Sequence, residues 1–172
     1  KDYTVSNMIK NLQDTLDMLK GRYGFKSFVL IGCSMGGKIV SNVDLNSYDI
    51  RKIVLWYSAI DYGRGLFNIP SRKERIAKKQ GYYPIENGWK LSYEYFKDER
   101  KYTTYKRLQK IDIPLLFVHG TFDRYVSYKS SVNTSKKCKN AKLHLIDGAD
   151  HGFHNDEHMK EALEVTLNFI KN

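Results

Sequence analysis

The sequence predicts an α/β fold in which a mostly parallel sheet is flanked by helices. Short apolar runs typical of buried strands alternate along the chain with segments whose apolar residues recur at helical spacing. One such run, Phe28 to Ile31, ends in a Gly-x-Ser-x-Gly turn that leads into a helix-compatible segment. The length of 172 residues suits a single domain with a sizeable core.

The N-terminal segment predicts an amphipathic helix. Residues 4–20 place apolar side chains at i, i+3, i+4 and i+7, which forms one apolar face. Thr4 or Ser6 is expected to cap the start of this helix, and Gly21 or Gly24 to end it.

The next strand, near residues 26–32, leads into the Gly-x-Ser-x-Gly turn. Its bulky apolar run shows no alternation, which predicts burial on both faces. The chain must then reverse sharply, and this nucleophile elbow leaves the hydroxyl of Ser34 exposed on a strained turn. We expect that a side chain at Gly32 or Gly36 would collide with the neighbouring strand or helix. Cys33 is expected to be a buried thiol.

The later elements continue the alternation of helix and strand. Two strands separated by a helix fit a βαβ unit, which requires the strands to be parallel. The expected elements are a helix from Gly36 to about Val43, strands at 52–58, 113–119 and 141–146, a short helix at 127–137 and a closing helix at 156–171.

Residues 61–110 interrupt this pattern, because they are too many for a simple connection. They hold seven of the thirteen tyrosines and thirteen Lys/Arg against six Asp/Glu, which is seven of the ten net positive charges. We interpret them as an inserted, mostly helical cap on a core made of residues 1–60 and 111–172. The cap is either a lid that lines a pocket for acidic substrates or a solvated insertion whose aromatic residues pack on the core.

Composition argues against several other classes of protein. The lysines are spread along the chain without a basic block, so the net charge of +10 indicates a solvated surface rather than nucleic-acid binding. No apolar run reaches the ~20 residues of a membrane span. Two cysteines and the lack of a visible signal peptide favour the cytoplasm. The sequence shows no metal-ligand spacing, phosphate loop or dinucleotide motif, so we expect no metal and no cofactor.

A serine hydroxyl is a weak nucleophile and needs a histidine base that a carboxylate orients. In a fold with a nucleophile elbow, the acid and then the base follow the serine at the carboxyl ends of strands. Asp123 follows the third predicted strand, and His151 follows the fourth. We therefore predict Ser34 as nucleophile, Asp123 as acid, His151 as base and the N–H of Met35 as an oxyanion donor.

Other residues compete for these roles. Asp61, after the second predicted strand, is an alternative acid. Asp150 is a weaker one, because it adjoins His151 and neighbours in sequence rarely face each other. His119 is expected to be structural, and Cys33 is disfavoured as the nucleophile because the turn exposes the serine. The remaining histidines are expected to be surface or core residues, namely His144, His154 and His158.

Three blocks of the sequence resemble the α/β-hydrolase superfamily. They are Gly32-x-Ser34-x-Gly36-Gly37, His119-Gly120-x-x-Asp123-x-x-Val126 and Gly148-Ala149-Asp150-His151-x-Phe153. The later half is most similar to bacterial cinnamoyl/feruloyl esterase-like serine hydrolases and to their acyl-hydrolase and serine-peptidase relatives.

The resemblance implies an α/β-hydrolase fold and the hydrolysis of small-molecule esters by Ser34, Asp123 and His151. A peptidase, a thioesterase and a non-catalytic binding protein of the same fold are the alternatives. Cys33 departs from the His, Tyr or other aromatic residue common before the nucleophile.

In this superfamily, the first strands of the sheet and the loop with a second oxyanion donor precede the elbow. Here only 33 residues precede Ser34, so we expect these strands to be absent from the chain. The elbow strand would then form an exposed apolar edge. We expect a missing N-terminal segment or a second chain to complete it, and a divergent minimal relative of the superfamily is the third alternative. We expect these 172 residues alone to be weakly active or inactive.

Overall fold

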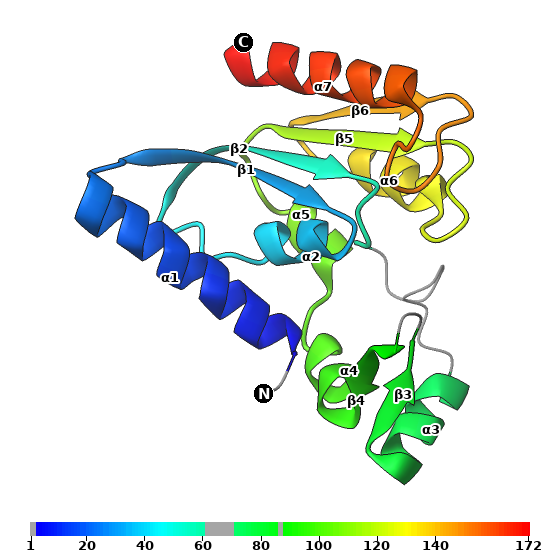
Figure 1. Ribbon diagram of the computed structural model, residues 1–172. Coiled ribbons are helices and arrows are strands. Elements are labelled where there is room, and N and C mark those ends of the chain that lie inside the picture. Colours follow the sequence, from blue (N-terminus) through cyan, green and yellow to red (C-terminus); the bar gives the residue numbers. More distant parts are fainter. Residues whose placement is uncertain (1–2, 61–70, 86–87) are drawn as a thin grey trace.

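The computed structural model describes residues 3–60, 71–85 and 88–172, and its centre is a four-stranded sheet (Figure 1). The strands lie in the order β1 (Ser27–Cys33), β2 (Asp49–Trp56), β5 (Leu115–Gly120) and β6 (Ala141–Ile146). Each neighbouring pair is parallel, so all four carboxyl ends meet at one edge of the sheet. The predicted α/β fold with a mostly parallel sheet is confirmed.

Whether a strand lies in the centre or at the edge of the sheet determines how far its side chains are buried. All six residues of β5 are buried, because this strand has a neighbour on each side and helices on both faces. In β1, Leu30 is buried, but Val29 is 36% exposed and Ile31 is 47% exposed. The expectation that β1 is buried on both faces is therefore wrong, because β1 is an edge strand and α7 packs over β5 and β6. The expected apolar edge is confirmed.

Helices cover both faces of the sheet (Figure 1). One face carries α1 (Val5–Tyr23), α2 (Met35–Ser41), α5 (Thr104–Leu108) and α6 (Tyr128–Ser135). α1 begins where Thr4 accepts a hydrogen bond from the N–H of Asn7, and it ends at Gly24 with φ +72°. None of the helices in the described part of the chain is long and apolar enough to cross a membrane.

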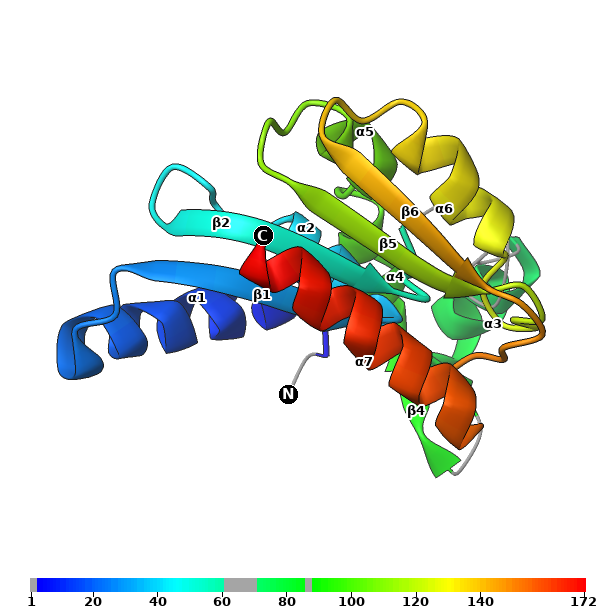
Figure 2. The ribbon, with the colours of Figure 1, turned by 90° about the horizontal axis from the view of Figure 1, so that it is seen from above.

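The opposite face carries α7 (Asp156–Lys171), which Figure 2 shows lying across the sheet. Trp56 Nε1 donates to Thr166 Oγ1 at 2.9 Å, and Lys52 Nζ donates to the carbonyl oxygens of Phe169 and Ile170 at 2.7 and 3.0 Å. The contacts of Lys52 place its positive charge at the C-terminus of α7, where the helix dipole favours it. Side chains from β2, β5 and α7 form the apolar core of this face.

A separate group of elements lies below α2 in Figure 1, next to the start of α1. It contains α3 (Ser71–Gln80), β3 (Tyr82–Pro84), β4 (Lys90–Ser92) and α4 (Tyr93–Glu99). The antiparallel pair β3–β4 was not expected in a mostly helical insertion. Its apolar cluster joins Tyr95 and Phe96 to residues of α1 and α2. Residues 61–70 lie outside the described part, and the boundaries of the cap stay a prediction.

Candidate active site

Ser34 occupies the turn between β1 and α2, with φ 51° and ψ −120°. A positive φ is strained for any residue with a side chain, so the surrounding bonds must hold it. The N–H of Ser34 donates to the carbonyl oxygen of Trp56 at 3.0 Å. The carbonyl oxygen of Ser34 accepts from the N–H groups of Gly37 and Ala59 at 3.1 and 2.9 Å. The turn is thus fixed from both sides.

Two glycines allow α2 to pack closely behind this turn. A Cβ atom at Gly32 would lie 2.6 Å from the carbonyl oxygen of Gly36 and from Cγ2 of Val40. A Cβ atom at Gly37 would collide with the side chain of Ser58. The expected collision at Gly32 is confirmed, but the one at Gly36 is wrong, because a Cβ there meets nothing within 4 Å. Gly37, the next residue, has the close contact instead.

The three residues singled out in sequence lie together at the carboxyl edge of the sheet. His151 Nε2 is 3.0 Å from Ser34 Oγ, and His151 Nδ1 is 2.8 Å from Asp123 Oδ2. The carboxylate accepts only, so Nδ1 carries the proton and Nε2 is free to accept from the serine hydroxyl. The side chain of Asp123 is fully buried, and that of His151 is 19% exposed.

Asp123 receives four hydrogen bonds. Oδ1 accepts from the N–H groups of Tyr125 and Val126, each at 2.8 Å. Oδ2 accepts from His151 and also lies 3.1 Å from Nε2 of His119. Burial alone would raise the pKa of Asp123, but the hydrogen bonds from His119, His151 and the two backbone groups outweigh it and hold this pKa well below its usual value. Asp123 is thus a stable carboxylate.

Aromatic rings flank the imidazole of His151. The ring of Tyr57 lies edge-on to it with centroids 4.7 Å apart, and the ring of Tyr125 lies at 5.4 Å. Tyr57 also contacts Phe153 at 4.9 Å. In the described residues, positive φ occurs outside glycine at Ser34, Tyr57 and Phe153. Within the described residues, the strained non-glycine backbone therefore gathers near His151.

Cys33 is an exposed residue on the edge strand, so the expectation of a buried thiol is wrong. It is exposed because β1 has a strand neighbour on one side in the described sheet. Its sulfur still makes a hydrogen bond with the hydroxyl of Tyr57. Partial burial raises the pKa of the Cys33 thiol, although the bond from Tyr57 acts to lower it. Burial, together with the contact with Cys33, raises the pKa of Tyr57.

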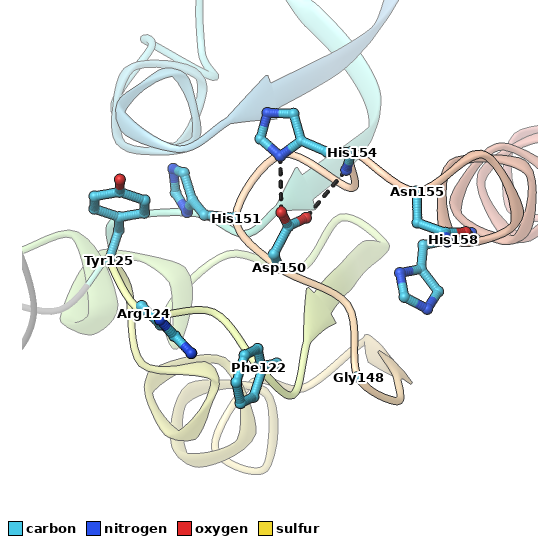
Figure 3. A pocket seen from close by; sticks show the side chains of 9 residues that line it. All are labelled: Phe122, Arg124, Tyr125, Gly148, Asp150, His151, His154, Asn155 and His158. Carbon is cyan, nitrogen blue, oxygen red and sulfur yellow. Dashed lines mark hydrogen bonds and ion pairs between the residues drawn. The ribbon is translucent and has the colours of Figure 1, made fainter.

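A hollow of about 490 Å³ opens beside His151 (Figure 3). The loops after β5 and β6 and the start of α7 supply its walls. The residues that line it are Phe122, Arg124, Tyr125, Gly148, Asp150, His151, His154, Asn155 and His158. Aromatic and ionisable side chains thus line the hollow next to the imidazole of His151.

Residues 27–172 match the prolyl oligopeptidase family. The chain belongs to this family. Over 65 residues it is also 34% identical to a protein of Synechocystis sp. described as a non-heme chloroperoxidase, and this match covers 37% of the chain and 23% of that relative.

Solved structures show the same fold. Est1E from Butyrivibrio proteoclasticus is similar with a TM-score of 0.77 and 22% identity, over 99% of this chain and 73% of that one. The monoacylglycerol lipase of Paleococcus ferrophilus has a TM-score of 0.75 and 18% identity, over 98% of this chain and 76% of that one. The resemblance to the α/β-hydrolase superfamily is confirmed, and membership of the prolyl oligopeptidase family supports a hydrolase.

The structure shows where several of the competing residues lie. Asp61 lies outside the described residues. Asp150 turns away from His151 and pairs with His154 at 2.9 Å (Figure 3). His144 pairs with Glu161 at 2.6 Å, and His158 lines the hollow.

Sequence reasoning missed the role of His119 in contacting Asp123. It treated this residue as structural, yet His119 Nε2 lies 3.1 Å from Asp123 Oδ2. The spacing of four residues between them is the signal that was available, since His119 lies near the end of β5 and Asp123 follows that end closely.

Proposed function

We propose that this protein is a serine hydrolase that cleaves carboxylic esters through an acyl-enzyme intermediate. Ser34 is the nucleophile, His151 the general base and Asp123 the residue that orients the base. The observation that carries the proposal is the unbroken hydrogen-bond chain from Ser34 Oγ through His151 to Asp123, with distances of 3.0 and 2.8 Å. This is the geometry that activates a serine hydroxyl.

In the first step, His151 Nε2 takes the proton of Ser34 while Oγ attacks the ester carbonyl carbon. Asp123 stabilises the imidazolium that forms, and its low pKa keeps it ionised throughout. The tetrahedral intermediate collapses, the C–O bond of the ester breaks, and His151 gives its proton to the leaving alkoxide. Water then attacks the acyl-enzyme with His151 again as base, and the acid is released.

The oxyanion of each tetrahedral intermediate needs N–H donors. Met35 begins α2, and the first N–H groups of a helix have no acceptor within it. We assign the N–H of Met35 as one donor, because it follows the nucleophile directly and can face the developing charge. Removal of one such donor costs about 10²–10³ in rate in a serine hydrolase of another fold.

The substrate we propose is a small ester with an aromatic or short acyl group. The hollow beside His151 has the aromatic side chains of Phe122 and Tyr125 in its wall, and both are partly exposed to a ligand. A structure of Est1E from Butyrivibrio proteoclasticus with ferulic acid bound has a TM-score of 0.78 to this chain and supports the aromatic choice.

The second candidate is a serine peptidase, which the match to the prolyl oligopeptidase family favours. The same three residues serve ester, thioester and amide hydrolysis, so the site alone does not separate these activities. A panel of p-nitrophenyl, feruloyl, thioester and aminoacyl substrates tests the choice. Faster turnover of the feruloyl and p-nitrophenyl esters supports the esterase, and faster turnover of aminoacyl amides replaces it with the peptidase.

A fluorophosphonate probe tests the nucleophile directly. The serine oxygen attacks phosphorus, fluoride leaves and His151 takes the proton, so a labelled peptide identifies the reactive residue. We expect labelling at Ser34 in the wild-type protein, loss of labelling in Ser34→Ala and retention in Cys33→Ser, the neighbouring control. Labelling that persists in Ser34→Ala but disappears in Cys33→Ser would make Cys33 the nucleophile. A full-length version of the protein that is never labelled is the result expected of a non-catalytic binding protein.

A further inference from the structure

His119 is a completely buried histidine that faces the carboxylate of Asp123. It lies in β5, and its exposed fraction is 0%. Nε2 is 3.1 Å from Asp123 Oδ2 and 3.1 Å from the carbonyl oxygen of Val126. On the other side of the ring, Nδ1 is 2.8 Å from the hydroxyl of Ser131 in α6. Both ring nitrogens therefore have partners inside the protein.

These partners determine which nitrogen carries the proton. The carboxylate oxygen of Asp123 and the carbonyl oxygen of Val126 can only accept, so Nε2 must donate. In the neutral ring, Nδ1 then accepts from the hydroxyl of Ser131. The surroundings of His119 thus select the Nε2–H form.

We propose that His119 is a positioning residue that holds Asp123 in the orientation in which it receives His151. The inference rests on the proposed function, because it assigns a purpose to an orientation that the Ser34–His151–Asp123 group needs. It goes beyond that function by adding a fourth side chain, from the interior of the sheet, that does not touch the substrate.

The four donors around Asp123 explain how this works. The N–H groups of Tyr125 and Val126 hold Oδ1, while His119 and His151 share Oδ2. With both oxygens held, the carboxylate cannot rotate about its Cβ–Cγ bond without losing hydrogen bonds in a buried site. The lone pair of Oδ2 that faces His151 Nδ1 is therefore fixed before any substrate binds.

His119 and His151 both donate to Oδ2 of Asp123, so they share the negative charge of this carboxylate. Each donor to a carboxylate stabilises its charge and weakens it as an acceptor for the remaining donors. The groups that interact with the charge of Asp123 are the imidazoles of His119 and His151, the N–H groups of Tyr125 and Val126, and the hydroxyl of Tyr57 at longer range. Loss of the donor at His119 leaves more of the charge on Asp123 to act on His151.

Replacing His119 by Gln or by Asn distinguishes a role in positioning Asp123 from a role in filling space. The nitrogen of Gln lies at the position of Nε2, so His119→Gln retains a donor toward Asp123. The nitrogen of Asn lies at the position of Nδ1, so His119→Asn retains a group toward Ser131 and loses the one toward Asp123. Both place a neutral amide in the same buried site, which makes them a matched pair.

The readout is the rate of fluorophosphonate labelling of Ser34 as a function of pH. We expect His119→Asn to be labelled about 10- to 100-fold more slowly than the wild type, by analogy with the loss seen when a hydrogen-bond partner of a metal-ligating residue is removed. The acid limb of its pH–rate profile should also differ from that of the wild type, because His151 then faces a carboxylate that has lost one of its four donors. His119→Gln should restore most of the labelling rate of Ser34 and the acid limb of the wild-type pH–rate profile. Equal rates and equal limbs for the two variants would overturn the proposal.

The nitrogen of His119 that carries the proton can be identified in the wild-type protein, which makes this part of the test independent of catalysis and of the folding of variants. Long-range ¹H–¹⁵N NMR reports which nitrogen of His119 is protonated, and the hydrogen-bonded Nδ1–H of His151 gives a strongly downfield signal. We expect the Nε2–H form of His119 and a downfield signal that changes in His119→Asn but returns in His119→Gln. An Nδ1–H form of His119 in the wild type would overturn the proposal, even where Ser34 is labelled normally. If Ser34 is never labelled, the proposed function fails, and the NMR result alone decides whether His119 positions Asp123.

Discussion

At the scale of single residues, the polar contacts of the site converge on Asp123. It is buried, it accepts four hydrogen bonds, and it is held ionised by them. A buried carboxylate with this many donors stabilises the fold as well as the site, because its charged form is favoured in the folded state over the unfolded one.

This gives a pH dependence of stability with a defined sign. The pKa of Asp123 in the folded state lies below its unfolded value of about 3.9. Its contribution is therefore complete above about pH 5, begins to fall near pH 4 and is fully lost only below the folded-state pKa. Asp123→Asn should be less stable than the wild type at pH 7, with a difference that narrows toward pH 3. Urea denaturation at pH 7, 5, 4 and 3 measures it.

Asp112→Asn is the matched control for this experiment. Asp112 pairs with Lys139 at 2.8 Å, but both side chains are 72% exposed, so the pair contributes little. The free energy of unfolding of Asp112→Asn should stay close to that of the wild type at all four pH values. A constant difference between Asp123→Asn and the wild type at all four pH values would contradict the expected loss of the carboxylate's contribution.

The thiols offer a second test at this scale. Burial raises the pKa of Cys138 to about 11, and burial also raises that of Cys33, against about 8.5 for a free thiol. Alkylation by iodoacetamide should be slow at pH 7 for both and should increase with pH, because the thiolate is the reactive form. Cys33, which is exposed, should react before Cys138. Mass spectrometry of each peptide against time measures both rates.

Tyr57→Phe tests the contact that modulates Cys33. The hydrogen bond from Tyr57 lowers the pKa of the Cys33 thiol, so its loss should slow alkylation of Cys33 at pH 8 and leave Cys138 unchanged. Faster alkylation of Cys33 in this variant would show that Tyr57 shields the sulfur rather than favouring its ionised form.

The structure brings together the three residues that the sequence singled out, but their surroundings could not be predicted from the sequence. The order Ser34, Asp123, His151 follows from strand ends, which apolar runs reveal. The contact of His119 with Asp123 depends on how β5 turns into its loop, and the exposure of Cys33 depends on which strand forms the edge of the sheet. Neither is encoded in local spacing, so both require the assembled sheet.

At the scale of elements, a buried ion pair links α2 to α4. Lys38 Nζ donates to Glu99 Oε1, and the two side chains are 3% and 1% exposed. Within the described residues, Oε2 of Glu99 has no hydrogen-bond partner. The helix that follows Ser34 is thus tied through Lys38 to the element that packs below it.

The pair predicts a non-additive effect on stability. Lys38→Met leaves the charge of Glu99 buried and uncompensated, which should cost about 3–5 kcal/mol. The double variant Lys38→Met/Glu99→Leu should recover most of this loss, because an apolar pair of similar size tolerates burial. Urea denaturation of the two single variants and the double variant measures the coupling.

Lys10→Met is the control, since Lys10 and Asp14 form an exposed pair on α1 with side chains 69% and 58% exposed. It should cost less than about 1 kcal/mol. A double variant at positions 38 and 99 as unstable as the sum of its singles would contradict the expected coupling.

The elements themselves were largely predictable. β6 (Ala141–Ile146) and α7 (Asp156–Lys171) match the expected bounds, because a clear apolar run and a clear helical period specify them. The pair β3–β4 was missed, because strands of three residues contain too few positions to show alternation. Short elements depend on tertiary contacts rather than on local pattern.

At the scale of the whole molecule, the outer edge of β1 is open in the described sheet. Its unpaired backbone groups and the exposed side chains of Val29 and Ile31 form a template for a further strand. We keep the completion of this edge by another segment or chain as a proposal.

The edge predicts concentration-dependent self-association of the 172-residue chain. Ile31→Lys should reduce it, because a charged side chain on an edge strand opposes strand pairing. Leu167→Lys is the control, since Leu167 is 51% exposed on α7, away from the edge. Light scattering across a dilution series measures both. Equal reductions in the two variants would attribute association to general apolar exposure rather than to the edge.

The hydrogen bond between Ser34 and His151 joins residues 117 positions apart in the chain. One partner follows the first strand of the sheet and the other follows the last, and β2 and β5 lie between these two strands. Loop closure over such a separation comes late in assembly. If Ser34 is the nucleophile that we propose, its reactivity reports when the sheet has formed. During refolding from urea, susceptibility to a fluorophosphonate should return after helical circular dichroism, and the delay between the two signals times the closing of the sheet.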